Sequence, residues 1–191
     1  MSALCRPYPD RVKVDGKTWE LNLSLKNVLM AMEVQDAEGL LPTDAVQLQC
    51  AWLFRDPQRV PHDPALCSRI LQAVFDLFPK PENDEREKVI DFEQDAPLIR
   101  SAFLRLGIDL TRDEIHFMKF LELLADLPPD TALMRTVELR QRPVPEINEH
   151  NREQVARLLE AKQRVAIKKT DAERRADMER QIMNTRMYWG E

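Results

Sequence analysis

The sequence predicts a mainly α-helical fold with one N-terminal β-hairpin and a long C-terminal helical extension. Three observations support this fold class. The chain has only four glycines among 191 residues, whereas Leu, Glu, Arg and Ala, which favour helices, are frequent. Apolar residues recur at helical spacing in one segment after another. Strand-like alternation around an Asp-Gly pair occurs near the N-terminus and is typical of a hairpin.

The hairpin is expected over residues 11–21, with Asp15-Gly16 as its turn. A two-stranded hairpin is marginal in water, so it must pack on helices. Three helices with apolar stripes are expected next, over residues 24–36, from Thr43 or Asp44 to Phe54, and over residues 64–78. The charged, proline-led residues 79–90 are expected to form an exposed linker.

Residues 91–127 predict two helices folded against each other. Asp91 is placed to cap the first helix, and Pro97 falls in its first turns, where proline is tolerated. An apolar face follows at helical spacing, and Gly107 supplies the left-handed residue that ends the helix.

The second helix of this block is expected to be central to the fold. Thr111 and Glu114 match a capping box at its start. From Ile115 to Leu124 it is apolar on nearly every side, which predicts that it is buried. A short helix over residues 131–140 is expected to close a domain of residues 1–142.

Residues 143–191 are expected to form a separate, charged helical extension. PVPEI at 143–147 breaks the pattern, and residues 148–188 contain neither Gly nor Pro. The apolar seam is too thin for a coiled coil, so this helix should depend on a partner or on self-association. The candidate partner-binding residues are apolar and lie in this extension: Val155, Leu158, Leu159, Val165, Met183, Met187 and Trp189.

The residues that usually carry catalysis or bind metals are not grouped in the sequence. The three histidines are far apart and not at metal-ligand spacing, and His116 is expected at a packed or half-exposed helix position. The carboxylates of residues 82–95 alternate with basic residues and are expected to form a solvated surface. We therefore expect no enzymatic activity, no cofactor and no metal.

The bulk properties exclude further classes of function. The net charge of −5 argues against nucleic-acid binding by the whole protein. Apolar runs stay well below the roughly 18 residues of a membrane span, so no membrane partner is expected. Three widely spaced cysteines suit a reducing cytoplasm, with Cys50 and Cys67 expected to be buried, inert thiols.

The block DFEQDAPLIRSAFLRLGIDL, followed by HFMKFLELLADLP and DTALMRTVELR, resembles a family of tail proteins from phages and prophages, the gene-product-fifteen family. VKVDGKTWELNLSLKNVLMAM and VFDLFPKP are also similar, so the resemblance covers about residues 8–142. His116 and Phe117 stand where the family has two large aromatic residues.

The resemblance implies a tail assembly chaperone for the tape measure protein in the host cytoplasm, without enzymatic activity or a cofactor. Such a chaperone would cover apolar helical surface on the tape measure until tail-tube subunits replace it. Two other functions remain open: a structural virion component, such as a connector or tail-completion protein, and a small DNA-binding regulator. A concentrated basic helix would favour the regulator, and residues 152–180 do not supply one.

Overall fold

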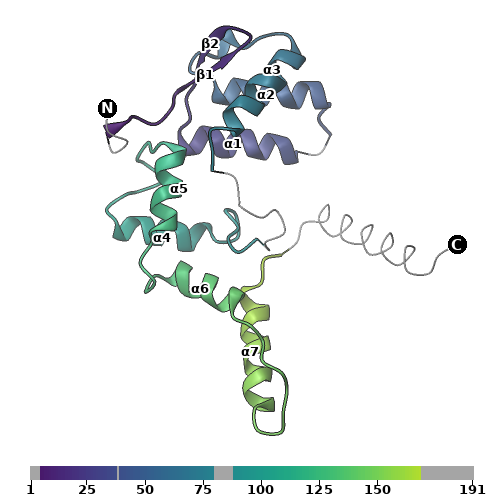
Figure 1. Cartoon of the computed structure of the whole chain (residues 1–191), viewed down its shortest axis with the longest axis vertical. Helices are drawn as coiled ribbons and strands as arrows, with labels where there is room; N and C mark the ends of the chain where they lie inside the picture. The colour runs from purple at the N-terminus through teal and green to yellow at the C-terminus, as the bar shows by residue number, and fades with distance from the viewer. Residues whose placement is uncertain (1–4, 38, 80–87, 169–191) are drawn as a thin grey trace, which may run out of the picture. The chain divides into compact units, whose positions relative to one another are not determined.

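The computed structural model describes residues 5–37, 39–79 and 88–168 and confirms the predicted mainly α-helical fold with one hairpin (Figure 1). The chain forms two compact units, each built from two stretches of sequence. Unit 1 comprises Met1–Arg86 and Phe103–Leu127, and unit 2 comprises Glu87–Ala102 and Pro128–Glu191. Among the described residues, none of the helices is long and apolar enough to cross a membrane.

Unit 1 begins with the predicted hairpin, formed by β1 (Arg11–Val14) and β2 (Lys17–Glu20). Asp15 and Gly16 both have positive φ, 51° and 75°, as the tight turn requires. Val12 lies opposite Trp19, and both side chains are buried. Because β1 also contacts α3 (Pro64–Phe75), the hairpin is packed on a helix as expected.

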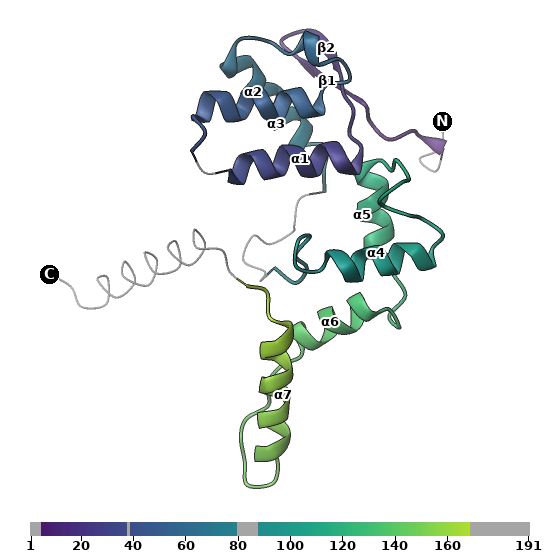
Figure 2. The ribbon, with the colours of Figure 1, turned by 180° about the vertical axis from the view of Figure 1, so that it is seen from behind.

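The predicted helices that follow are α1 (Leu25–Asp36), α2 (Pro42–Leu53) and α3, with a short 3₁₀ turn, η2 (Pro57–Arg59), before α3. Ser24 and Asp63 cap α1 and α3. α1 and α2 pack side by side as an antiparallel pair, and α2 also contacts α3 (Figure 1 and Figure 2). Two boundaries differ from prediction, since proline starts α2 at residue 42 and α3 ends at residue 75.

The signature block contains α4 (Ala96–Arg105) and α5 (Phe117–Ala125). Gly107, with φ of 78°, follows α4 as predicted. The capping box predicted for α5 is wrong, because Thr111 instead donates to Asp109 in a preceding turn, at 2.6 Å. The true N-cap is His116, whose Nδ1 accepts from the Met118 N–H at 3.2 Å.

The start of α5 is fixed by the backbone of residues 21–25. Ile115 precedes the helix, and its carbonyl accepts from the Leu25 N–H at 2.8 Å, while the Phe117 N–H donates to Leu23 at 2.8 Å. These bonds hold residues 115–116 extended, so α5 is shorter than predicted. Its burial is confirmed on one face only, because Phe117, Phe120 and Leu124 are buried whereas Lys119 and Glu122 are exposed. Phe120 stacks on Phe103 with ring centroids 5.0 Å apart in the core.

Unit 2 contains α6 (Ala132–Gln141), capped by Thr131 as its sequence suggests, and α7 (Arg152–Val165). The chain between them runs back alongside α7 (Figure 1 and Figure 2). The helix predicted over residues 148–188 ends within the described residues at Val165, and residues 169–191 lie outside them.

Candidate functional site

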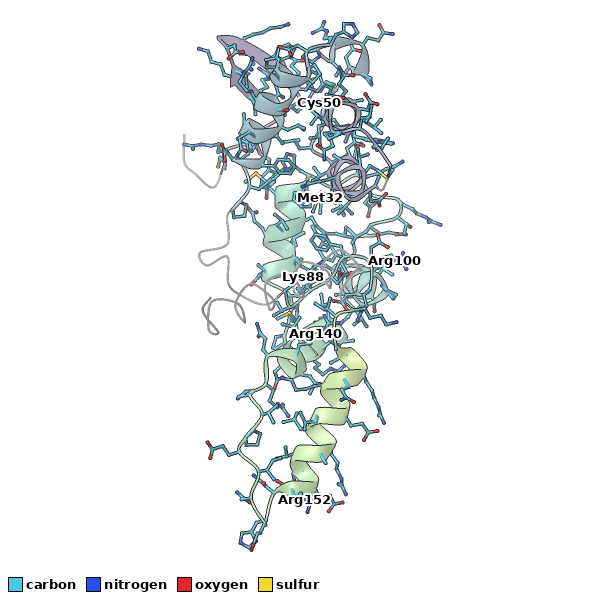
Figure 3. All side chains as sticks on the ribbon, turned by 90° about the vertical axis from the view of Figure 1, so that its right-hand side faces the viewer. Met32, Cys50, Lys88, Arg100, Arg140 and Arg152 are labelled. Atoms are coloured by element: carbon cyan, nitrogen blue, oxygen red, sulfur yellow. The ribbon has the colours of Figure 1, made fainter. Side chains whose placement is uncertain are left out.

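A buried ion pair between Asp95 and Arg140 organises unit 2. Arg140, near the end of α6, lies where that helix meets the C-terminal end of α7 (Figure 3). Its two terminal nitrogens donate to the two Asp95 oxygens at 2.6 and 2.8 Å. The side chains of Arg140 and Asp95 are only 8% and 3% exposed. Two parallel hydrogen bonds of this kind fix the orientation of the guanidinium group against the carboxylate, and the two charges neutralise each other.

Three atoms of this pair, Arg140 Nε and Nη1 and Asp95 Oδ2, also bond to the backbone. Arg140 Nε donates to the Val165 carbonyl at 2.6 Å, and Nη1 also donates to the Val89 carbonyl at 2.9 Å. Asp95 accepts from the Asp91 N–H at 2.9 Å. Three stretches distant in sequence, residues 89–95, α6 and the end of α7, are therefore joined by one guanidinium group.

The ionised form of Asp95 is favoured in this setting. Burial by itself would raise the pKa of Asp95, but hydrogen bonds from Arg140 and from the Asp91 N–H outweigh burial and lower it. The expectation of a solvated carboxylate surface over residues 82–95 is therefore wrong at Asp95. Asp91 does not cap α4 as expected, because α4 begins only at Ala96; its Oδ1 instead accepts from the N–H groups of Glu93 and Gln94 in the turn before the helix.

The C-terminal end of α7 is secured by hydrogen bonds to residues outside the helix. Gln94 donates to the Ala166 carbonyl at 2.8 Å and accepts from the Lys168 N–H at 3.0 Å. Lys162 donates to the carbonyls of Arg140 and Arg142 at the end of α6. These contacts cross the predicted domain boundary at residues 142 and 143, so α7 packs with residues on the other side of it.

The predicted partner-binding residues fall into three groups. Val155 is 1% exposed and belongs to the core of unit 2, so it presents no free surface. Leu158 and Val165 are half-buried, and Leu159 is 42% exposed. Met183, Met187 and Trp189 lie outside the described residues. Leu159 is therefore the most accessible apolar residue of the described part of this set.

Two apolar residues that the sequence analysis did not select lie in the segment beside α7. Ile147 is 67% exposed, and Val144 is also exposed. The segment runs antiparallel to α7, as the bond from Lys162 to the Arg142 carbonyl at one end and the tight Asn148–Asn151 turn at the other end require. The two residues were missed because PVPEI was interpreted only as a break.

We call the accessible apolar residues of α7 and of the segment beside it the α7 surface: Val144, Ile147, Leu158 and Leu159. Arg157 pairs with Glu153 and Arg164 with Glu160, each pair one turn apart on α7 and well exposed. The surface thus combines apolar side chains with charged pairs on the same helix, as the cores and rims of protein interfaces do.

Other side chains singled out from the sequence have structural surroundings. The Tyr8 ring stacks on His116 at 5.0 Å, and burial lowers the pKa of His116. Cys50 and Cys67 are fully buried, and burial raises the pKa of both thiols. Within the described residues, no group of three or more His, Cys, Asp or Glu side chains is arranged to hold a metal ion.

Comparison with known proteins identifies the family. No curated protein and no solved structure matches the chain. The model of the family described as Bacteriophage Gp15 protein matches residues 7–167, which include both units' described helices and the Asp95–Arg140 pair. The match extends past residue 142, where the resemblance seen in the sequence stopped, and reaches the end of α7. The chain therefore belongs to the Bacteriophage Gp15 protein family.

Proposed function

We propose that this phage protein is a tail assembly chaperone that binds the tape measure protein in the host cytoplasm. It acts by reversible contact and carries out no enzymatic reaction, so it needs no cofactor. Tail-tube subunits replace it as the tube closes around the tape measure. A long, apolar helical protein such as the tape measure needs a bound partner that prevents its aggregation. That partner must then dissociate when the tail-tube subunits bind.

The observation that carries this proposal is the α7 surface. Leu159 and Ile147 are exposed although apolar, and α7 carries two exposed ion pairs, one on either side of Leu159 in the sequence. Modest apolar area combined with charged pairs suits binding that is specific and reversible. The underlying frame is rigid, because the Asp95–Arg140 pair fixes α7 against the rest of unit 2.

Co-expression with the tape measure gene of the same phage tests the proposal. The wild-type chain should keep the tape measure in the soluble fraction and be recovered with it in a pull-down. A double variant, Leu159→Asp with Ile147→Asp, should lose both effects while its circular dichroism spectrum stays unchanged. The matched control is Leu104→Asp, because Leu104 is a leucine of unit 1 whose exposure, 57%, lies between those of Leu159 and Ile147.

Two results would contradict the proposal. One is a tape measure that remains insoluble with the wild-type chain, or remains soluble with the double variant. The other is mass spectrometry that finds several copies of the protein in each finished virion. That second result would favour a structural role, because a chaperone leaves before the tail is complete.

A further inference from the structure

A second group of exposed apolar residues lies on α1 and α2 of unit 1. Leu41 is 66% exposed at the start of α2, and Leu48, seven residues later, is also exposed. With Ala45 they form a stripe along one face of α2, about 10 Å long at the rise of an α-helix. Met32 is exposed on α1, whose last turns lie beside the first turns of α2 (Figure 2).

Apart from Lys26 at the start of α1, the charged residues of α1, α2 and the turn between them are all acidic. Residues 27–54 contain no Lys or Arg, although the whole chain has 28 among 191 residues. They contain four acidic residues: Glu33, Asp36, Glu38 and Asp44. Glu33 and Asp44 are exposed, and the described part of the chain offers neither of them an ion-pair partner. Asp44 is three residues from Leu41 and four from Leu48, so uncompensated negative charge borders the leucine stripe.

We propose that this face, the α1–α2 surface, binds a basic amphipathic helix of a partner protein. Leucines at positions 41 and 48 are two helical turns apart, which matches the spacing of i and i+7 residues on a docking helix. Lysines or arginines beside that apolar stripe would meet Glu33 and Asp44 across the border. A neutral or acidic helix would leave those carboxylates unpaired or repelled, so charge sets which helix binds.

This inference goes beyond the proposed function. It concerns unit 1 rather than the α7 surface, and it predicts binding of a helix whether or not that helix comes from a tape measure. The proposed function and this inference can fail separately. The co-expression test depends on Leu159 and Ile147, whereas the peptide-binding test below depends on Leu41 and Leu48.

The test uses the full chain and two synthetic peptides of about 18 residues, roughly five helical turns. Both carry leucines at i, i+3, i+4 and i+7, and their polar face is lysine in one and glutamate in the other. Binding is measured by fluorescence anisotropy at low and high salt. Hydrogen exchange of the complex then reports which residues become protected.

The expected result is that the lysine peptide binds, more weakly at high salt, and protects residues 31–52. Leu48→Asp should weaken it roughly tenfold or more, which is about 1.4 kcal/mol. Glu33→Lys with Asp44→Lys should shift preference to the glutamate peptide. Leu104→Asp should bind as the wild type does.

The proposal is overturned if the lysine peptide does not bind, or if both peptides bind equally well. It is also overturned if Leu48→Asp, folded by circular dichroism, binds like the wild type. Protection confined to α7 would assign the peptide to the other surface and equally refute this one. Leu41→Ser, a milder change at a well-exposed position, repeats the test if Leu48→Asp does not fold.

Discussion

Replacing Asp95 by alanine should destabilise unit 2 by about 3–5 kcal/mol, the range for removing one partner of a buried ion pair. The structure explains why the loss is large. Arg140 would keep its charge in a site where it is 8% exposed, and it would lose two of its four hydrogen bonds. The Asp91 N–H would also lose its acceptor. Little water can reach the guanidinium to compensate.

The chain has two units, so a single unfolding curve would mix them. Hydrogen exchange of the α6 and α7 amides under native conditions measures the free energy of opening of unit 2 directly. Asp95→Leu combined with Arg140→Met should be far less harmful than Asp95→Ala, because no charge is left buried. Arg142→Ala, which breaks the exposed pair with Glu138, should cost below about 1 kcal/mol. A loss below about 1 kcal/mol for Asp95→Ala would refute the reasoning.

Three further predictions concern the core, a titrating cap and α7. Phe120→Ala should cost about 3–5 kcal/mol in chemical unfolding, because it empties a large aromatic site; a cost below about 1 kcal/mol would place Phe120 outside the core. The pKa of His116 is lowered, so the unfolded chain binds its proton more readily, and stability should fall as pH drops below the ordinary value of 6.5. His116→Asn, which keeps a capping acceptor, should flatten that part of the pH profile, and an unchanged profile would exclude His116 as the cause. Val155→Asp should unfold α7 by circular dichroism whereas Leu159→Asp should not, and equal effects would contradict their different burial.

Features determined by neighbouring residues were predictable from the sequence. Asp15-Gly16 predicted the hairpin turn, Ser24 lies at the start of the first helix, and Gly107 follows α4 with the expected left-handed backbone. In each case the physical cause lies within a few residues. The buried face of α5 was also predictable, because its apolar residues recur at helical spacing. The exposed face with Lys119 and Glu122 was not recognised.

Features that depend on distant partners were not predictable. Asp95 has the local sequence of a surface residue, and its burial depends on Arg140, 45 positions later. His116 caps α5 because residues 23–25 hold its backbone extended. The exposed Ile147 was missed because its prominence depends on how the chain folds back along α7.

The Asp95–Arg140 pair also determines when unit 2 can fold during synthesis. The Arg140 acceptors include the Val165 carbonyl, 25 residues later in the chain. At a synthesis rate of roughly 5–20 residues per second, Val165 is added to the chain about 1–5 s after Arg140. In the nascent chain α6 therefore carries an incompletely paired guanidinium group. A ribosome that stalls before Val165 would leave α6 without the contact that closes the unit, so such a fragment should be an early target for proteases.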